Sequence, residues 1–69
     1  MKLSARNNIK GKIRSIDIGA VNAEVSVEIS PGIEMTSIIT KRSCENLRLK
    51  EGKEVYLVVK ASNVMIGTE

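Results

Sequence analysis

Histidine, tryptophan and phenylalanine are absent from this 69-residue sequence, and cysteine, proline and tyrosine occur once each. Without histidine the commonest general base is missing, and a single cysteine, Cys44, allows neither an internal disulfide nor a zinc site of ordinary ligands. The eight acidic residues are spread over turns and polar positions and form no obvious acid–base pair. The five glycines are isolated, so no phosphate-binding glycine loop of the Walker type occurs. We therefore expect a protein that is not an enzyme.

Long apolar runs are also missing. No stretch approaches the roughly 18 apolar residues of a membrane helix, and no secretory signal pattern is present. We expect a protein that does not enter the membrane and that is cytoplasmic, where a single unpaired thiol remains reduced. Residues 1–69 make one domain, and a domain this small buries only about 60% of the surface of its unfolded chain. Because neither a disulfide nor a metal is available, we expect self-association to stabilise it.

The charge balance favours an anionic partner. The formal net charge is +3 and the sequence pI about 9.3, but Tyr56 is the only aromatic residue on which a base could stack. Basic residues are scattered among acidic ones and do not form a run. These features disfavour a nucleic-acid partner, although a nucleic-acid-binding OB-type module remains the alternative. A purely structural oligomerisation domain is a third possibility.

Apolar and polar residues alternate most clearly over residues 21–30, and this period of two predicts a half-buried strand. The apolar face holds Val21, Ala23, Val25, Val27 and Ile29. Ser30, Pro31 and Gly32 predict a turn, because proline presets one backbone angle and glycine permits a positive φ. A second strand over residues 33–40 then completes a hairpin.

Upstream, the apolar positions change parity. Ile9, Gly11 and Ile13 are odd, whereas Ile16 and Ile18 are even. A β-bulge near Arg14 and Ser15 would produce this change, and a bulge together with a glycine bends a strand into a barrel. Residues 17–20 predict the turn into the next strand.

The second half of the chain predicts shorter elements. Residues 41–47 lose the period of two and read as a helical turn capped by Thr40 or Ser43, and residues 50–52 read as a turn. Residues 55–61 predict a strand that is apolar on both faces, which another subunit would cover. Residues 64–66 predict a final short strand. The expected fold is all-β, a small OB-like barrel of five to six strands with one short helical turn.

Two clusters combine a cation with hydroxyl or amide donors, as a tetrahedral oxyanion requires. They are residues 4–8, which include Ser4 and Arg6, and residues 60–63, which include Lys60 and Ser62. In the simpler interpretation, these are surface cations and a turn. Micromolar affinity needs about 8 kcal/mol, and one charge-assisted hydrogen bond contributes about 1.5 to 3 kcal/mol. Because immobilisation also costs several kcal/mol, about four to six donors must converge, from distant segments or from two subunits.

At these residues the sequence resembles the molbindin, or Mop, family of molybdate-binding proteins, which also occurs in molybdate-responsive regulators and importer ATPases. The motifs that carry the resemblance are Ser4-Ala5-Arg6-Asn7 followed by Gly11, then residues 36–40, residues 50–52 and residues 60–65. The resemblance implies a single Mop/TOBE-like domain over residues 1–69. It also implies an OB-like barrel that pairs into dimers and commonly into hexamers, with molybdate held between subunits.

By motif position, the resemblance also implies the residues that bind the anion. Ser4, Arg6 and Lys60, with the backbone of Ala61, would contact it from one subunit, and Thr40 and Ser43 from the partner. Ser62 is a further candidate. The implied role is storage or homeostasis of molybdate, and tungstate, which has nearly the same size, should bind comparably.

Overall fold

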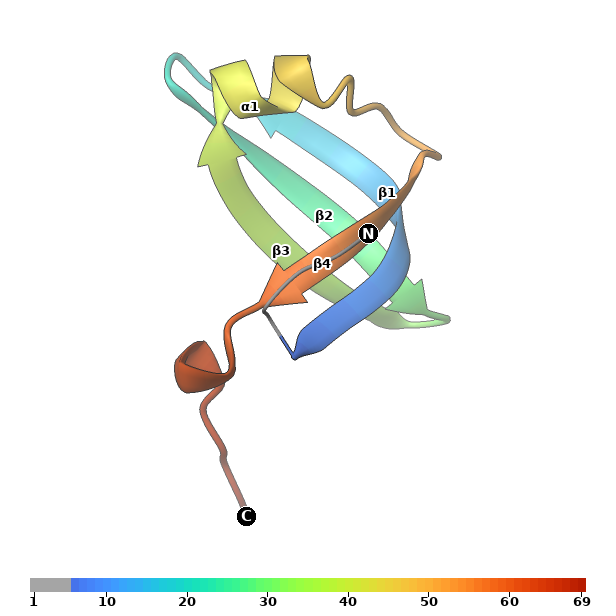
Figure 1. Ribbon diagram of the computed structural model, residues 1–69. Coiled ribbons are helices and arrows are strands. Elements are labelled where there is room, and N and C mark those ends of the chain that lie inside the picture. The colour runs from blue at the N-terminus through green and yellow to red at the C-terminus, as the bar shows by residue number, and fades with distance from the viewer. Residues whose placement is uncertain (1–5) are drawn as a thin grey trace.

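The computed structural model describes residues 6–69 of the chain. Within these residues, four antiparallel strands form one sheet in the order β3-β2-β1-β4, and a short helix joins β3 to β4 (Figure 1). The elements are β1 (Asn7–Ile18), β2 (Asn22–Ser30), β3 (Ile33–Thr40), α1 (Lys41–Asn46), β4 (Glu54–Val59) and the 3-10 turn η1 (Ala61–Asn63). The all-β class with one short helix is confirmed.

The hydrophobic core lies on the inner face of the sheet, where the alternation of β2 placed it. Val25 and Val27 are buried together with Ile13 of β1. Half-buried apolar side chains pack against these three: Ile16, Ile29, Ile39, Leu49, Val55 and Leu57. Val21 is expected on the same face. It is instead exposed, because it lies in the turn before β2.

Strand β1 bends and pairs with a different neighbouring strand along each half of its length. Its first half pairs with β4, from Asn7 to Lys12, and its second half pairs with β2, from Lys12 to Ile18. The register with β2 shifts between Ile13 and Ser15, which confirms the bulge predicted there. Gly11 allows the close approach, because an added Cβ would lie 2.5 Å from Val27 Cγ1. The bend carries β4 across the sheet (Figure 1).

The predicted turns are also present. Pro31 and Gly32 join β2 to β3, and Gly32 has the positive φ of +80° that its turn requires. The turn from β1 to β2 is closed by a hydrogen bond of 2.8 Å from Gly19 N to Asn22 O. Each junction that glycine predicted in the sequence is therefore a junction in the fold.

Helix α1 follows β3 directly and packs one side chain inward. Cys44 is 4% exposed and is a free thiol. Among residues 6–69 no helix could cross a membrane, since α1 has only six residues.

Within residues 6–69 the structure has four strands in an open sheet, so the predicted count of five to six strands and the closure of the sheet into a barrel are not confirmed. Residues 64–66 form no strand, and Met65 and Ile66 are more than nine-tenths exposed. An apolar triplet becomes a strand only beside a free sheet edge and a surface that buries it. Here η1 turns the chain away, and the last residues project from the sheet (Figure 1).

Candidate functional site

Arg6 and Lys60 lie side by side at one end of the sheet, which we call the cationic end. Asn7 pairs with Val59 in the antiparallel register of β1 and β4, so the residues just outside this pair are Arg6 and Lys60. Both are exposed. Two segments 54 positions apart in the sequence therefore meet at this end of the sheet.

The chain beyond Lys60 turns into η1, where Ala61 and Ser62 are located. Lys60 has an extended backbone before the turn, and its carbonyl accepts a hydrogen bond of 2.8 Å from Asn63 N. Val64 N bonds to Ala61 O at 3.2 Å. In the described part of the chain these turn bonds use the amides of Asn63 and Val64, not those of Ala61 and Ser62. The predicted Ala61 amide, next to Lys60 in the sequence, is thus not used by these turn bonds.

Thr40 and Ser43 form a second group, which we call the hydroxyl end. Thr40 ends β3 in an extended conformation (φ −70°, ψ 150°) and is the N-cap of α1. Its Oγ1 accepts a hydrogen bond of 3.0 Å from Ser43 N and donates one of 2.8 Å to Ser43 Oγ. The backbone beside it is held by a bond of 2.7 Å from Lys41 N to Val21 O. The capping role of Thr40 predicted from the sequence is confirmed.

The two ends are far apart within one chain. Thr40 pairs with Asn22, and the neighbouring residue Ala23 pairs with Ile18 at the far end of β1. The cationic end flanks Asn7, the first residue of the same strand. Figure 1 accordingly shows α1 and η1 at opposite ends of the sheet. The structure joins Arg6 to Lys60 and Thr40 to Ser43, but it does not join the two groups. Ser4 lies outside the described residues.

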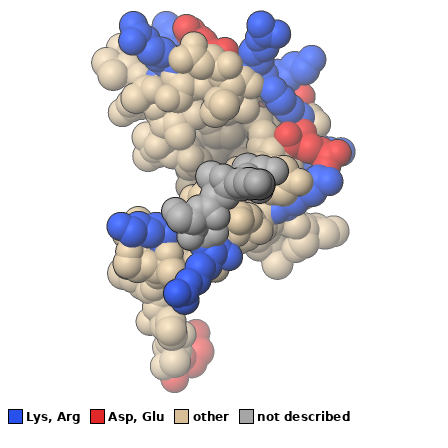
Figure 2. All heavy atoms as spheres, viewed as in Figure 1, with Lys and Arg blue, Asp and Glu red and all other residues tan. Residues whose placement is uncertain are grey.

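Charged side chains on this face occur in mixed groups. Figure 2 shows Lys and Arg at both ends of the view with Asp and Glu among them. Toward the other end of the β1–β4 ladder, where β4 begins, Lys10 and Glu54 form an ion pair of 3.0 Å. The hydrogen bond and charge of Glu54 raise the pKa of Lys10, and the same contacts with Lys10 lower the pKa of Glu54. This pair joins the two strands that carry Arg6 and Lys60.

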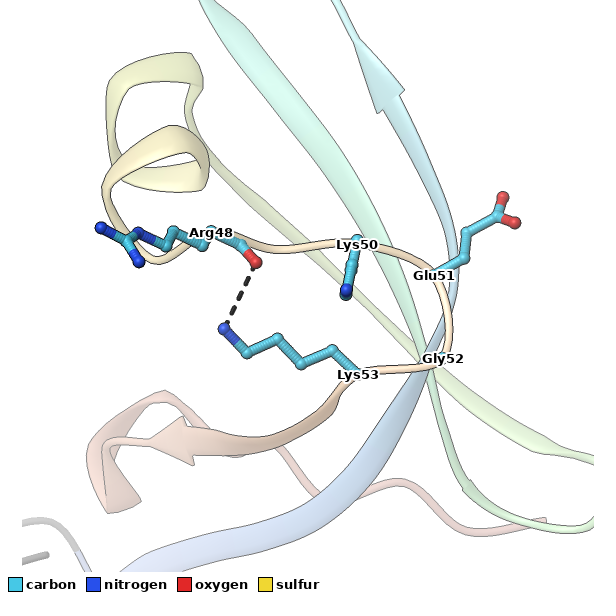
Figure 3. Close-up of a pocket in the computed structure, with 5 residues that line it drawn as sticks. All are labelled: Arg48, Lys50, Glu51, Gly52 and Lys53. Carbon is cyan, nitrogen blue, oxygen red and sulfur yellow. Dashed lines mark hydrogen bonds between the residues drawn. The ribbon is translucent and has the colours of Figure 1, made fainter.

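Lys53 has a structural role that the sequence analysis did not identify. Its Nζ donates to the carbonyl oxygens of Leu47 at 2.8 Å and Arg48 at 3.3 Å, just beyond the end of α1. Lys53 and Arg48 also line a hollow of about 500 Å³, together with Lys50, Glu51 and Gly52 (Figure 3). In Figure 3 the Lys53 side chain runs back under the loop toward Arg48, while Glu51 points away. No sequence signal marks this contact, because it depends on how the loop folds back.

The arrangement offers donors and cations. Among residues 6–69, His, Cys, Asp and Glu form no group of three or more that could hold a metal ion. Arg6 and Lys60 form no ion pair with another described residue. A pocket built from these groups would combine positive charge with N–H and O–H donors, which suits an anion.

Comparison with known proteins identifies the family. Residues 3–66 match the TOBE domain. The chain is 45% identical over its full length, and over the full length of the relative, to a probable molybdenum-pterin-binding protein of Haemophilus influenzae. It resembles the solved structure of MopII from Clostridium pasteurianum, with 48% identity and a TM-score of 0.91 over 97% of this chain and all of that one.

A third similar structure is the cytoplasmic molybdate-binding protein ModG with molybdate bound, at 45% identity and a TM-score of 0.94. That match covers all of this chain and 49% of the ModG chain. The TOBE match covers nearly the whole sequence, and both relatives with Mop-type names match over nearly their full length. The chain therefore belongs to the TOBE domain family and, within it, to the molbindins.

Proposed function

We propose that this molbindin binds molybdate between two subunits, with the cationic end of one chain facing the hydroxyl end of the other. The first subunit would supply Ser4, Arg6, Lys60 and the backbone of Ala61, with Ser62 as a further donor. The partner would supply Thr40 and Ser43. Binding of molybdate is supported by the relatives, which match this chain over its whole length. Their names or titles state molybdenum-pterin or molybdate binding.

The observation that carries the interface site is the separation of the two ends within one chain. Micromolar affinity requires about 8 kcal/mol and therefore about four to six convergent donors. Arg6, Lys60, Ser62 and the amide of Ala61 lie at one end of the β1–β4 ladder, whereas Thr40 and Ser43 lie at the other end of β1. A second chain brings the missing hydroxyls to the cations without any change in the fold.

Self-association has independent support from the outer surface of the sheet. Tyr56 and Val58 on β4 are 53% and 47% exposed, and Ile38 on β3 is 68% exposed. Apolar side chains on strand faces are stabilised when a second layer covers them, by about 25 cal/mol for each Å² removed from water. We assign that layer to further copies of this chain, as dimer units that form a hexamer. The strongly bent sheet suits the OB-like barrel that the resemblance implies.

Selectivity would follow from a pocket in which cations and hydrogen-bond donors predominate and no carboxylate accepts a proton. Molybdate near neutral pH carries no proton, whereas phosphate usually keeps one that needs an acceptor. The unmatched proton would cost roughly 1 to 3 kcal/mol. Sulfate would be rejected by its smaller size, and tungstate would bind comparably to molybdate. The protein would hold the anion unchanged, for storage or homeostasis in the cytoplasm.

Calorimetric titration of the purified protein with molybdate, tungstate, sulfate and phosphate tests the proposal, with the assembly size measured in the same buffer by light scattering. We expect molybdate and tungstate to bind in the micromolar range or tighter, and only to the oligomer. Equal affinity for sulfate would overturn the selectivity argument. Elemental analysis of protein from molybdate-supplemented cells separates this function from that of an oligomerisation domain without ligand.

A further inference from the structure

We propose that Lys53, which is not among the proposed anion contacts, positions the hydroxyl end by holding the last turn of α1. This inference rests on the proposed function and adds a positioning residue to it. Lys53 directly precedes β4 and is half-buried. Its Nζ donates to Leu47 O at 2.8 Å and to Arg48 O at 3.3 Å. An ammonium has no lone pair and can only donate, so the direction of both bonds is fixed.

The helix that carries Ser43 needs support from outside. It has six residues, whereas an isolated helix shorter than about 12 residues is marginal in water. Of the six described residues of α1, Cys44 alone is buried. Beyond Leu47, the C-cap of the helix, Arg48 has a φ of +54°, a left-handed conformation in which an arginine is sterically strained. The last turn of α1 therefore depends on contacts with other segments.

Hydrogen bonds connect Lys53 to Ser43 through one residue, Leu47. Leu47 O accepts from Lys53 Nζ, and Leu47 N donates to Ser43 O at 3.0 Å. Ser43 N in turn donates to Thr40 Oγ1 at 3.0 Å. The donor in each of these bonds is an ammonium or a backbone N–H, so none depends on where a hydroxyl proton lies. A change at Lys53 can thus reach the residue whose hydroxyl the proposed site uses.

The backbone of Lys53 is itself anchored to the core. Gly52 N donates to Ile13 O at 2.8 Å, and Ile13 N donates to Lys53 O at 3.0 Å. Ile13 is 1% exposed and lies at the bulge of β1. Figure 3 shows the Lys53 side chain running from this anchored backbone to the carbonyl of Arg48. Lys53 therefore holds the end of α1 at a fixed place relative to β1.

Two measurements on Lys53→Met separate positioning from stabilisation alone. Hydrogen exchange of the Leu47 and Leu49 amides, which bond to Ser43 O and Cys44 O, reports the opening of the last turn. Calorimetry with molybdate as the titrant gives the affinity, and light scattering verifies the assembly. A cation at a helix C-terminus changes an equilibrium constant by about two- to fivefold, so exchange should accelerate by that factor. Affinity should fall by a similar factor, because part of the binding free energy must then order the helix.

Two further variants serve as matched controls. Lys53→Arg keeps a cation that can donate to both carbonyls, and it should restore the exchange rate and the affinity to within about 1.5-fold of the wild type. Lys50→Met removes the same charge from the same hollow, where its ammonium is not bonded to the carbonyls of α1 in the described chain. It should leave both values unchanged.

The outcomes separate this inference from the proposed function. If the wild type binds molybdate and Lys53→Met exchanges faster but binds equally well, Lys53 only stabilises the helix and the positioning role is wrong. Unchanged exchange in Lys53→Met, or an equal loss of affinity in Lys50→Met, also overturns it. Absence of molybdate binding by the wild type would instead overturn the proposed function, and the positioning role with it.

Discussion

The cationic end and the hydroxyl end are built in different ways. Arg6 and Lys60 are long exposed side chains that flank two paired strands, and neither forms an ion pair with another described residue. Thr40 and Ser43 are short and already bonded to each other at a helix cap. The cationic end offers charge, but its flexible side chains lose conformational entropy when they are ordered. The hydroxyl end offers hydroxyl groups whose orientation is already fixed. In the proposed site, attraction and orientation of the anion would therefore come from separate parts of the fold.

The largest expected effect removes the charge. Arg6→Ala and Lys60→Ala should each weaken molybdate binding at least about tenfold, which is about 1.4 kcal/mol, and together about a hundredfold. The assembly should persist, because neither side chain forms an ion pair among the described residues. Lys12→Ala combined with Lys50→Ala removes the same total charge from other exposed positions and serves as the control. Calorimetry would contradict the comparison if both double variants lost equal affinity.

The next effect concerns the strand that connects the two ends. Gly11→Ala would place a Cβ 2.5 Å from Val27 Cγ1 and 2.8 Å from Glu28 O. Overpacking of this kind costs about 1 to 3 kcal/mol, so we expect a lower free energy of unfolding in urea. Gly67→Ala is the control, since no atom lies within 4 Å of its added Cβ. If the two variants are equally stable, β1 does not depend on this close approach to β2.

A smaller effect is expected at the end of α1. Lys53→Met keeps an unbranched apolar stem but removes the ammonium that bonds to the carbonyls of Leu47 and Arg48. A cation at a helix C-terminus contributes about 0.3 to 1 kcal/mol, and we expect a loss of that size in urea unfolding. Lys50→Met, in the same hollow but without such a bond, should change stability less. Molybdate affinity should fall less than in the Arg6 and Lys60 variants.

The smallest effect concerns the ion pair between β1 and β4, the two strands that Arg6 and Lys60 flank. The lowered pKa of Glu54 means that its pair with Lys10 stabilises the fold above the ordinary glutamate pKa of 4.5. This contribution disappears as the pH falls through the lower value that Glu54 has in the folded protein. At pH 7 Glu54→Gln should lower the melting temperature slightly, and the difference from wild type should vanish in acid.

Glu34→Gln, on the exposed face of β3, is the control for that titration. It should leave the melting temperature unchanged at both pH values, since Glu34 forms no ion pair with a described residue. High salt should also reduce the effect of Glu54→Gln, because both members of its ion pair are exposed. A difference that persists in acid would show that the carboxylate charge is not its cause.

The sequence predicted those parts of the fold that depend on local pattern. The period of two placed Val25 and Val27 in the core, and the change of parity after Ile13 located the bulge. The apolar residues 64–66 predict a strand that the structure does not have. Strand formation also depends on a free sheet edge and on a surface that covers the strand. Neither is visible in the residues themselves.

Part of the candidate site could also be predicted from the sequence. The motifs placed a cation in each cluster, and the register of β1 and β4 puts Arg6 and Lys60 just outside the same residue pair. The sequence could not tell that the hydroxyls of Thr40 and Ser43 bond to each other, nor that Lys53 reaches the end of α1. Both depend on distances that arise only after the chain has folded.

Cys44 provides an internal reporter of the hydroxyl end. Its thiol is 4% exposed and sits next to Ser43 in the sequence, on a helix of six residues. A thiol reagent reaches such a side chain mainly when the helix opens, so the rate of modification measures the opening equilibrium of α1. Molybdate that bonds to Ser43 would slow this reaction without any label having been introduced. The only cysteine of the chain thus allows the local opening of α1, at the hydroxyl end, to be measured in solution.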